Sequence, residues 1–596
     1  MASAATVQAL ARQSRKMFPN CHIVLGGVHA TFLYEEILKR WSYVDYVAVG
    51  EAENSFSELV ARLARGDSAE GIPGIAGRRA DGSLDWVGPA EPVADLGQLP
   101  IPARYFKYEI VATSRGCPGN CSFCCSPGMW GRRVRERPVA HVLEELRLLR
   151  NQHGLTQVMF KDETFTARPT RVRELCQAMV DEQLNLWWTC DTRVDCLDEE
   201  RLYWMRKAGC FLVSLGVESG SERLLRDMGK GTNLEKIRRG SLLARQFGML
   251  VRFYMIAGLP DEEPADLQAS LDLIETCKPN FVFPTVLIVS PGTKIWEQYK
   301  QKFHVNNSLW FAPTRKRFIE FDPTHQFLTA SAGKKLLGYP DYLKEHPQQE
   351  NLYPHTEVEL RWAQERLSDC FAPNYDLAMF LKKEGRFAEA IPFLAQALRL
   401  HPTFDKGWID LGECYDRQGE LDQALVCWHQ AVVTEGITPQ NRAICFFYLG
   451  LGLEAKGDLE GALGLWKRAS ATFPSYGAPI QRLAERCVQL GRWIEAQDAA
   501  TAWANLEPES GPAWHNAALA ALGLGLADVA QTHFEKALNL MPDNPEIYCD
   551  YAVLMAQAGL PGEALKIVET CLQITPGFPR ALEFAEKLRK RPKDSL

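Results

Sequence analysis

The sequence predicts an α/β plus all-α protein. Its centre is expected to be a partial (β/α)6 TIM-like barrel, preceded by a partial Rossmann-like layer and followed by an α-solenoid. Three features support this: two strand–glycine–helix units in residues 1–75, six strand-plus-helix units in 108–300, and an internal repeat in 371–578. Strands that alternate with helices indicate a parallel sheet, whereas a repeat of about 34 residues indicates stacked helix pairs.

The length and charge of the chain limit its function classes. With 596 residues it is long enough for three or four domains, and its net charge of −7 gives no electrostatic case for nucleic acid. Residues 1–16 lack an apolar segment of signal-peptide length, and the apolar run at 281–290 is too short to span a bilayer. We therefore expect a cytoplasmic protein with no membrane partner, in which most of the seventeen cysteines are reduced thiols.

The first 75 residues contain two units in which a strand, a glycine turn and a helix follow one another. Strands are expected at 22–29 and 44–50, and helices at 31–40 and 55–65. Glycines at strand ends let the backbone approach a ligand closely. Residues 76–107 are rich in glycine, proline and aspartate, which predicts an irregular linker.

Six strands alternate with helices in the central segment. They are expected at 108–113, 157–160, 186–190, 211–216, 251–256 and 281–290. Asp162, Arg193, Glu218 and Gly258 each lie just past one of these strands. Because the carboxyl ends of barrel strands meet at one face, these residues predict a site there. For any one of them, a merely solvated strand end is the alternative.

The first of these strands runs into a loop with three closely spaced cysteines, Cys117, Cys121 and Cys124. Three thiolates on one loop can hold three irons of a four-iron cluster and leave the fourth iron open. Zinc is the alternative, but structural zinc needs four ligands, and the nearest further candidates are Cys125 and His141. A disulfide does not suit a chain that nothing marks as secreted.

The run Thr113–Cys124 resembles the cluster loop of the radical S-adenosylmethionine (radical SAM) enzymes. Further phrases resemble strand-end motifs of the group of that family that is associated with a cobalamin-binding domain: 162–165, 192–195, 216–220 and 258–262. The resemblance implies a [4Fe-4S] cluster on the three cysteines, with S-adenosylmethionine (SAM) on the open iron. Reductive cleavage of SAM would then give a 5′-deoxyadenosyl radical that acts on an unidentified substrate, with electrons from an external donor.

The same resemblance assigns the SAM contacts. Phe123 and the stretch from Ile256 to Gly258 would flank the adenine. Arg193 and Glu218 would contact the ribose and the methionine, and Asp162 belongs to the same set. Lys230 would pair with the SAM carboxylate, since a carboxylate requires a cation. A solvated loop is the alternative for Lys230.

The N-terminal layer resembles the second half of a cobalamin-binding domain. By that resemblance Gly26, Gly27, Gly50 and Glu51 would border the pocket for the cobalamin tail, and methylation or rearrangement would be the outcome. Residues 1–20 leave room for only one helix where the first half of such a domain should stand. Cobalamin binding and a structural remnant that packs on the barrel therefore both stay open.

Two further segments have alternative interpretations. The arginines at 132, 133, 135 and 137 could bind an anionic substrate or a cofactor phosphate, or form a solvated, ion-paired face. Residues 301–370 could cap the substrate site or serve as a linker; their aromatic residues include Trp310, Phe311, Phe318 and Phe321.

The C-terminal segment carries a tetratricopeptide signature, with Trp408, Leu411, Gly412 and Tyr415 at its spacing. Alanine recurs at 390, 424, 462, 496, 530 and 564, and glycine at 385, 419, 457, 491, 525 and 559. The longer second interval implies an insertion near 435–441. We expect six repeats over 371–578 and a capping helix with a tail over 579–596. Such a solenoid usually binds a protein or peptide partner; passive dimerisation is the alternative.

These features favour a radical SAM enzyme. The alternative is a tetratricopeptide scaffold with a catalytically silent core, but a silent core would not need three cysteines at this spacing.

Overall fold

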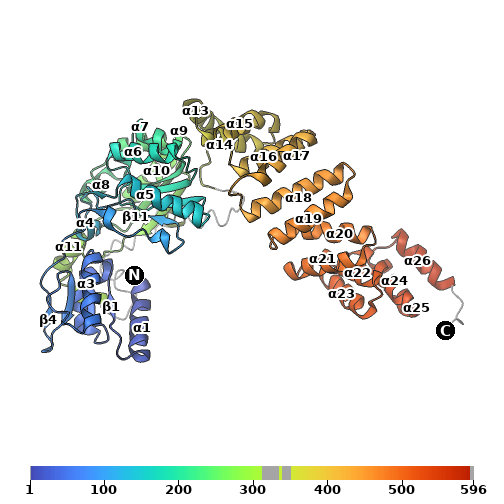
Figure 1. Cartoon of the computed structure of the whole chain (residues 1–596), viewed down its shortest axis with the longest axis horizontal. Helices are drawn as coiled ribbons and strands as arrows, with labels where there is room; N and C mark the ends of the chain where they lie inside the picture. The colour runs from blue at the N-terminus through green and yellow to red at the C-terminus, as the bar shows by residue number, and fades with distance from the viewer. Residues whose placement is uncertain (1, 312–334, 339–350, 591–596) are drawn as a thin grey trace. The chain divides into compact units, whose positions relative to one another are not determined.

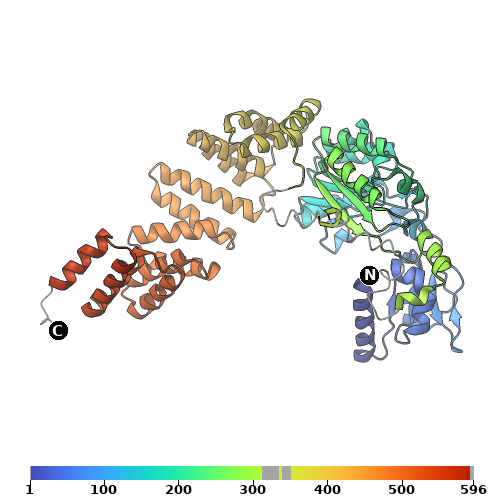
Figure 2. The ribbon, with the colours of Figure 1, turned by 180° about the vertical axis from the view of Figure 1, so that it is seen from behind.

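The computed structural model describes residues 2–311, 335–338 and 351–590. The chain forms two compact units, Met1–Phe380 and Leu381–Leu596. Figure 1 shows an α/β unit and a helical solenoid, and Figure 2 shows the same ribbon from behind. The predicted fold class is confirmed.

The N-terminal layer is a small sheet in the order β1-β2-β3-β4. Its strands are β1 (Val24–Leu25), β2 (Tyr46–Ala48), β3 (Ile75–Arg78) and β4 (Leu84–Asp85), and its helices are α1 (Ala2–Met17), α2 (Val28–Arg40) and α3 (Glu53–Arg65). β1 and β2 are parallel, as predicted, but β3 and β4 add an antiparallel hairpin. The expectation of an irregular linker from residue 76 onward was therefore wrong for this hairpin. Its Arg78 donates to the carbonyl oxygens of Leu38 and Val44, which ties it to the layer.

A parallel sheet of six strands forms the core of the first unit, in the order β12-β11-β10-β9-β8-β5. Its strands are β5 (Ile110–Val111), β8 (Gln157–Phe160), β9 (Trp187–Thr192), β10 (Cys210–Glu218), β11 (Leu250–Ala257) and β12 (Phe281–Val286). The main connecting helices are α5 (Val139–Arg147), α6 (Pro169–Asp181), α7 (Glu199–Lys207), α9 (Leu234–Gln246) and α10 (Pro264–Cys277). Every strand pair is parallel, which agrees with the predicted open barrel of six units.

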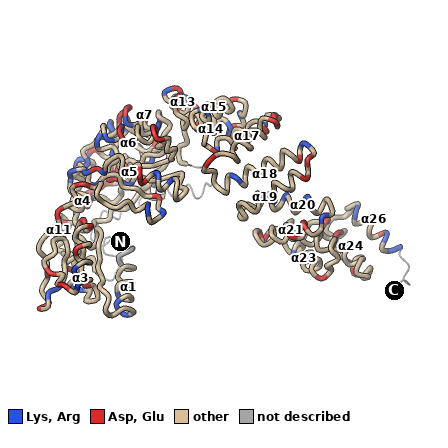
Figure 3. The backbone as a smooth tube through the Cα atoms, in the orientation of Figure 1, with Lys and Arg blue, Asp and Glu red and all other residues tan. Residues whose placement is uncertain are grey.

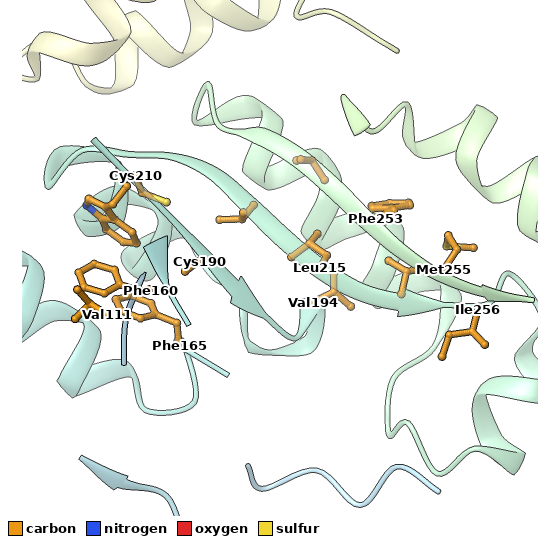
Figure 4. Packing of buried hydrophobic residues seen from close by; sticks show 14 of the residues in the cluster. Val111, Phe160, Phe165, Cys190, Val194, Cys210, Leu215, Phe253, Met255 and Ile256 are labelled. Atoms are coloured by element: carbon orange, nitrogen blue, oxygen red, sulfur yellow. The ribbon is translucent and has the colours of Figure 1, made fainter. Parts of the chain in front are cut away.

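One face of this sheet is packed with buried hydrophobic residues. Phe160, Cys190, Leu215, Phe253 and Met255 are at most 1% exposed, and Figure 4 shows them in one packed cluster. Since neighbouring residues of a strand point to opposite faces, the residues between them lie on the other face of the sheet.

A short antiparallel pair, β6 (Ser114–Arg115) and β7 (Arg135–Glu136), precedes and follows the cysteine loop. β6 follows β5 after only two residues, so the first barrel strand leads directly into the loop, as predicted.

The segment 301–370 is described in part. Helix α11 (Lys294–Phe303) is followed by a short helical turn, and helix α13 (Glu357–Arg366) lies near its end. Trp310 is buried and packs against Trp296 with ring centroids 5.4 Å apart. Phe318 and Phe321, which the substrate-cap hypothesis includes, lie outside the described residues.

The solenoid consists of the predicted six helix pairs and a final helix. These are α14 (Phe371–Lys383), α15 (Phe387–Leu400), α16 (Asp405–Arg417), α17 (Leu421–Val433), α18 (Pro439–Ala455), α19 (Leu459–Thr472), α20 (Gly477–Gln489), α21 (Trp493–Leu506), α22 (Gly511–Gly523), α23 (Ala527–Leu540), α24 (Pro545–Gln557), α25 (Pro561–Ile574) and α26 (Pro579–Lys590). The recurring alanines are fully buried, and the recurring glycines have φ between +69° and +84°. The insertion lengthens α18 to 17 residues.

Charge is mixed along this second unit. Figure 3 shows Lys and Arg interspersed with Asp and Glu over the helices. Many of these charges pair between neighbouring helices, for example Arg482 with Glu454 and Arg580 with Asp550. Across the described residues, no helix is both long and apolar enough to cross a membrane.

Candidate functional site

The cysteine loop begins with a turn that only glycine fits. Gly116 has φ +98°, and a Cβ at this position would lie 2.4 Å from the carbonyl oxygen of Arg133. Three cysteines, Cys117, Cys121 and Cys124, follow as free, half-buried thiols before the short helix α4 (Ser126–Trp130). The turn therefore sets the direction in which the loop leaves β6.

Backbone N–H groups point at two of the sulfur atoms. Gly119 donates to Cys117 Sγ (3.4 Å) and Ser126 donates to Cys124 Sγ (3.4 Å). A Cβ built on Gly119 would lie 3.2 Å from Cys117 Sγ and 3.8 Å from Cys121 Sγ, so these two sulfurs flank the same glycine. The Ser126 N–H lowers the pKa of Cys124 and so favours its thiolate, which is the form that binds metal.

Burial acts in the opposite sense on Cys124. It raises the pKa of this thiol, although the Ser126 N–H lowers it. Metal binding at Cys124 would therefore release a proton. Over the described residues, no three His, Cys, Asp or Glu side chains surround a position for a single metal ion. Three free thiols on one loop, two of them with N–H donors, fit an iron–sulfur cluster by the chemistry of the donor set.

Asp162 anchors the strand that leads into this loop. Its side chain is 2% exposed and accepts hydrogen bonds from the Thr113 N–H (2.6 Å), the Thr113 hydroxyl (2.6 Å) and the Ser114 N–H (3.0 Å). Burial raises the pKa of Asp162, and these hydrogen bonds oppose the rise. The predicted strand-end carboxylate thus holds the base of the loop. Thr164, two residues further from the end of β8, also reaches the loop, since its Oγ1 lies 3.3 Å from Cys117 Sγ.

Arg193 joins the loop to the segment after β10. Its guanidinium donates to the Lys230 carbonyl oxygen (2.5 Å), pairs with Asp195 (2.9 Å) and lies 3.9 Å from Cys121 Sγ. Burial lowers the pKa of Arg193, but its hydrogen bond and charge interaction with Asp195 outweigh this effect and raise it. A fixed cation therefore stands beside one of the cluster-loop sulfurs.

Glu218 and Lys230 form a buried ion pair, with Glu218 Oε1 and Lys230 Nζ 2.6 Å apart and both side chains less than 10% exposed. Glu218 has φ +71°, an uncommon conformation for a residue with a side chain, and it lies at a bulge where β10 leaves its register with β11. Lys230 Nζ also lies 5.8 Å from the centroid of the Phe123 ring. The structure thus brings together three of the residues predicted to contact SAM.

The remaining predicted SAM residues lie at the end of β11. Ile256 is buried, and Gly258 has φ +79°. The Gly258 N–H donates to Glu262 Oε2 (2.6 Å). Glu262 is 3% exposed, and burial raises its pKa to about 7 against the backbone hydrogen bonds that lower it. The other carboxylate oxygen of Glu262 has no hydrogen-bond partner among the described residues.

Glu51 links the N-terminal layer to the cluster-loop hairpin. It is 9% exposed and pairs with Arg115 (2.8 Å) on β6 and with Arg135 on β7. Burial raises the pKa of Glu51, but the two arginines outweigh it and lower the pKa. Arg115 also pairs with Glu53 and lies 5.0 Å over the Trp130 ring. Glu51, predicted to border a cobalamin pocket, therefore has its carboxylate oxygens occupied by arginines.

Two of the four arginines in the basic run at 132–137 are ion-paired. Arg135 binds Glu51 and the Val93 carbonyl oxygen, and Arg137 pairs with Glu145 (2.5 Å). These contacts match the alternative of an ion-paired face for Arg135 and Arg137, whereas Arg132 reaches the Pro118 carbonyl oxygen in the cysteine loop (3.2 Å).

One of the two predicted glycine turns, at Gly26, lines a cavity of about 390 Å³. The lining also includes Leu25, His29 and Trp41 of the N-terminal layer and Cys125, which follows Cys124. Gly27 (φ +87°) and Gly50 (φ +75°) have nothing within 4 Å of a built Cβ, so the backbone there is uncovered. The uncovered turn at Gly26 and Gly27, beside a cavity that reaches Cys125, fits a ligand that enters from the layer toward the cysteine loop.

Sequence reasoning missed several residues of this region. Arg115 and Glu262 were inside quoted phrases, but their long-range partners have no sequence signal. Lys161, Asp191 and Tyr254 form a hydrogen-bonded group on the face of the sheet opposite the buried cluster. Only the alternation of buried and exposed residues along their strands could have indicated their common face.

Comparison with known proteins gives matches to three family models. The Radical SAM superfamily matches residues 111–274, the B12 binding domain matches 1–60, and the tetratricopeptide repeat matches 381–427 and 521–588. The first match contains the three cysteines and all the predicted SAM contacts, and the second contains Gly26, Gly27, Gly50 and Glu51.

Similar proteins include an uncharacterized methyltransferase of Pyrococcus horikoshii, 30% identical over 53% of this chain and 70% of that protein. An anaerobic magnesium-protoporphyrin IX monomethyl ester cyclase of Rubrivivax gelatinosus is 28% identical over 49% of this chain and 56% of its own length. A solved radical SAM methyltransferase of Kitasatospora setae, with cobalamin and a [4Fe-4S] cluster bound, has 19% identity and a TM-score of 0.44 over 50% of this chain and 60% of that one.

The cysteine loop and the family-model matches agree with the cofactors predicted from the sequence: a [4Fe-4S] cluster, SAM and cobalamin. The chain belongs to the radical SAM superfamily, as an enzyme with a B12-binding domain before its core and tetratricopeptide repeats after it.

Proposed function

We propose that this chain is a cobalamin-dependent radical SAM methyltransferase that acts on carbon. One observation carries the proposal: a buried carboxylate, Glu51, at a turn of the B12-binding layer is paired with Arg115, two residues before the first cluster cysteine. This contact connects the cobalamin-type layer to the cluster loop within one unit. The resemblance to relatives named as methyltransferases supports the reaction type.

The cluster on Cys117, Cys121 and Cys124 would supply one electron to SAM and so generate a radical able to attack an unactivated C–H bond. This chain's residues would bind and orient SAM. Lys230 would hold its carboxylate, and Glu218, already paired with Lys230, would accept from its ribose hydroxyls.

The adenine would lie between Phe123 and the end of β11. Phe123 offers a half-buried ring, and Ile256 offers an apolar side chain. At Gly258 the N–H is occupied by Glu262, so the glycine would contribute its backbone shape, and Glu262 would hold that shape. Arg193 would fix the Lys230 backbone and place positive charge beside Cys121.

The test is anaerobic reconstitution with iron and sulfide, followed by addition of SAM and a reductant. We expect about four irons per chain and reductant-dependent 5′-deoxyadenosine. The Cys117→Ala, Cys121→Ala, Cys124→Ala variant should lose both, whereas Cys125→Ala is the matched control in the same loop and should keep both. Equal 5′-deoxyadenosine from the triple variant and the parent would refute the proposal.

The cobalamin part has its own test. Protein mixed with hydroxocobalamin and then desalted should keep a corrinoid band in its visible spectrum. Bulky side chains at the uncovered turns, in Gly27→Leu or Gly50→Leu, should abolish that band, and Gly66→Leu in the same layer is the control, because its turn also has positive φ and open space. A corrinoid band of parental strength in all three variants would remove these turns from the site.

The solenoid has a separate proposed role, the binding of a protein or peptide partner; the electron donor is also external. All of the repeats except most of α14 lie in a compact unit of their own, Leu381–Leu596, which supports a binding function separate from the core. Capture of a partner by the full chain should persist in the triple cysteine variant. A capture that depends on those cysteines would argue against a role for the solenoid alone.

A further inference from the structure

One face of the six-stranded sheet carries a row of polar and aromatic side chains. Asp191 on β9 and Arg252 on β11 are both register partners of Ser214 on β10, and Tyr254 on β11 pairs with Phe283 on β12. These residues alternate with Cys190 and Phe253 of the buried cluster in Figure 4, so they point to the opposite face. Lys161, directly after β8, joins the row through Asp191.

The polar groups of this row are held in fixed positions. Lys161 Nζ pairs with one oxygen of Asp191, and the Tyr254 hydroxyl donates to the other, Oδ1, at 3.2 Å. Both oxygens of the carboxylate therefore have a donor. The Tyr254 ring meets the Phe283 ring edge-on, with centroids 5.8 Å apart.

The row has an excess of positive charge. The charge of Lys161 is balanced by Asp191, but Arg252 has no carboxylate within ion-pair distance among the described residues. Its guanidinium lies 5.6 Å from the centroid of the Phe281 ring, so a ring face and not an anion is its neighbour. Planar guanidinium groups bind carboxylate, sulfonate or phosphate with paired hydrogen bonds.

Apolar surface lies beside this cation. Phe283 is 51% exposed although it sits in the sheet, and the Lys161 side chain is also 51% exposed. At the amino-terminal end of the same strands, Trp187 packs edge-on against Phe211 and Phe371, which covers that end. Among the described residues, the face is therefore covered at the start of β9 and remains exposed at Phe283 and Lys161. Lys161 and Asp191 lie at the carboxyl ends of β8 and β9, where barrels carry their sites, whereas Arg252 and Phe283 are the third residues of β11 and β12.

The row lies next to the cofactor residues. Arg193 follows Asp191 by two positions and reaches both Cys121 Sγ and the Lys230 carbonyl oxygen. A ligand bound beside Asp191 would therefore lie close to Arg193, which contacts the cysteine loop.

We propose that this row is the substrate-binding surface, and that it takes a substrate with a flat apolar body and an anionic group. This inference rests on the proposed function and names the substrate class for that same site. Arg252 binds the anionic group, Phe283 and Tyr254 contact the flat body, and the Lys161–Asp191 pair holds the Tyr254 hydroxyl in place.

The experiment uses full-length, anaerobically reconstituted protein and two probes, 1-naphthoate and its uncharged analogue 1-naphthalenemethanol, measured by titration calorimetry. We expect the parent to bind naphthoate on the order of tenfold more tightly than the alcohol. Arg252→Met should remove this preference, and Phe283→Ala should weaken both probes. The control is Arg468→Met, which also removes an arginine over a phenylalanine ring, in the solenoid, and should change nothing.

Equal binding of the two probes by the parent, or an unchanged preference in Arg252→Met, would overturn the inference. If Arg252→Met does not fold, the parent's preference and the Phe283→Ala variant decide the question. The same preparations are assayed for reductant-dependent 5′-deoxyadenosine, which does not require the substrate site. Equal binding of the two probes by a parent that makes normal 5′-deoxyadenosine would refute this inference alone, whereas absence of 5′-deoxyadenosine in the parent would refute the proposed function.

Discussion

Replacement of Asp162 separates an anchoring role from direct SAM contact. In Asp162→Ala the Thr113 N–H, the Thr113 hydroxyl and the Ser114 N–H all lose their acceptor, and both residues are less than 9% exposed. In Asp162→Asn the amide oxygen can still accept from the two N–H groups, and the amide NH₂ can donate to the Thr113 hydroxyl.

The expected free energies differ accordingly. An unsatisfied buried donor costs about 1–3 kcal/mol, so three of them destabilise the start of the loop by roughly 3–9 kcal/mol. The cost falls to roughly 2–6 kcal/mol if the hydroxyl of Thr113 rotates to another acceptor. The Asn variant keeps three neutral hydrogen bonds in place of charge-assisted ones and should lose about 1 kcal/mol.

The assay is hydrogen–deuterium exchange of the peptide that contains residues 110–125, before reconstitution, followed by iron analysis after it. The Ala variant should exchange this peptide faster and bind less iron, and the Asn variant should resemble the parent in both. The anchoring role would be refuted if the Ala variant kept parental protection and iron, or if the Asn variant kept its iron but failed to bind SAM.

Three other perturbations test separate parts of the structure. Lys230→Met leaves the Glu218 carboxylate buried and unpaired and should cost about 3–5 kcal/mol of core stability. The double variant Lys230→Met, Glu218→Gln should recover most of this stability. Equal urea midpoints for the single and the double variant would contradict a coupled pair. The pKa of Glu262 is about 7 in the fold against 4.5, so the folded state binds the extra proton and the core should lose stability as pH rises from about 4.5 to 7. Glu262→Gln should flatten this dependence, and an unchanged pH profile of the urea midpoint would refute it. In the solenoid, a Cβ at Gly412 would lie 2.4 Å from the indole of Trp428, so Gly412→Ala should lower the thermal midpoint of unfolding. Gly464→Ala is the control, because a Cβ at Gly464 faces open space. Equal thermal midpoints for the two variants would contradict this packing.

Patterns of short range were predictable from the sequence. The alternation of strands and helices gave the six parallel strands, because each unit buries its own apolar face. The phase of the repeats was also predictable, since the alanines mark close helix contacts and the glycines mark turns with positive φ. The cysteine loop was readable because its ligands lie on one short segment.

Features that depend on distant partners were not predictable. The hairpin of β3 and β4 lies in a stretch rich in glycine and proline, and it becomes a sheet only by pairing with β2. Glu51 was predicted to border a cobalamin pocket because it follows a glycine turn, but the arginines that it pairs with, Arg115 and Arg135, lie 64 and 84 residues away in the sequence. Asp162 was placed at the correct strand end, but its hydrogen bonds to Thr113 and Ser114 appear only when β5 and β8 are side by side.

We propose that Cys117, Cys121 and Cys124 hold a cluster with one iron open to SAM. The most direct measurement is electron paramagnetic resonance of the reduced, reconstituted protein with and without SAM. The structure predicts a [4Fe-4S] signal that changes on addition of SAM in the parent and in Cys125→Ala, and no such signal in Cys124→Ala. A SAM-responsive signal that survives in Cys124→Ala, or a parent signal that SAM leaves unchanged, would contradict it.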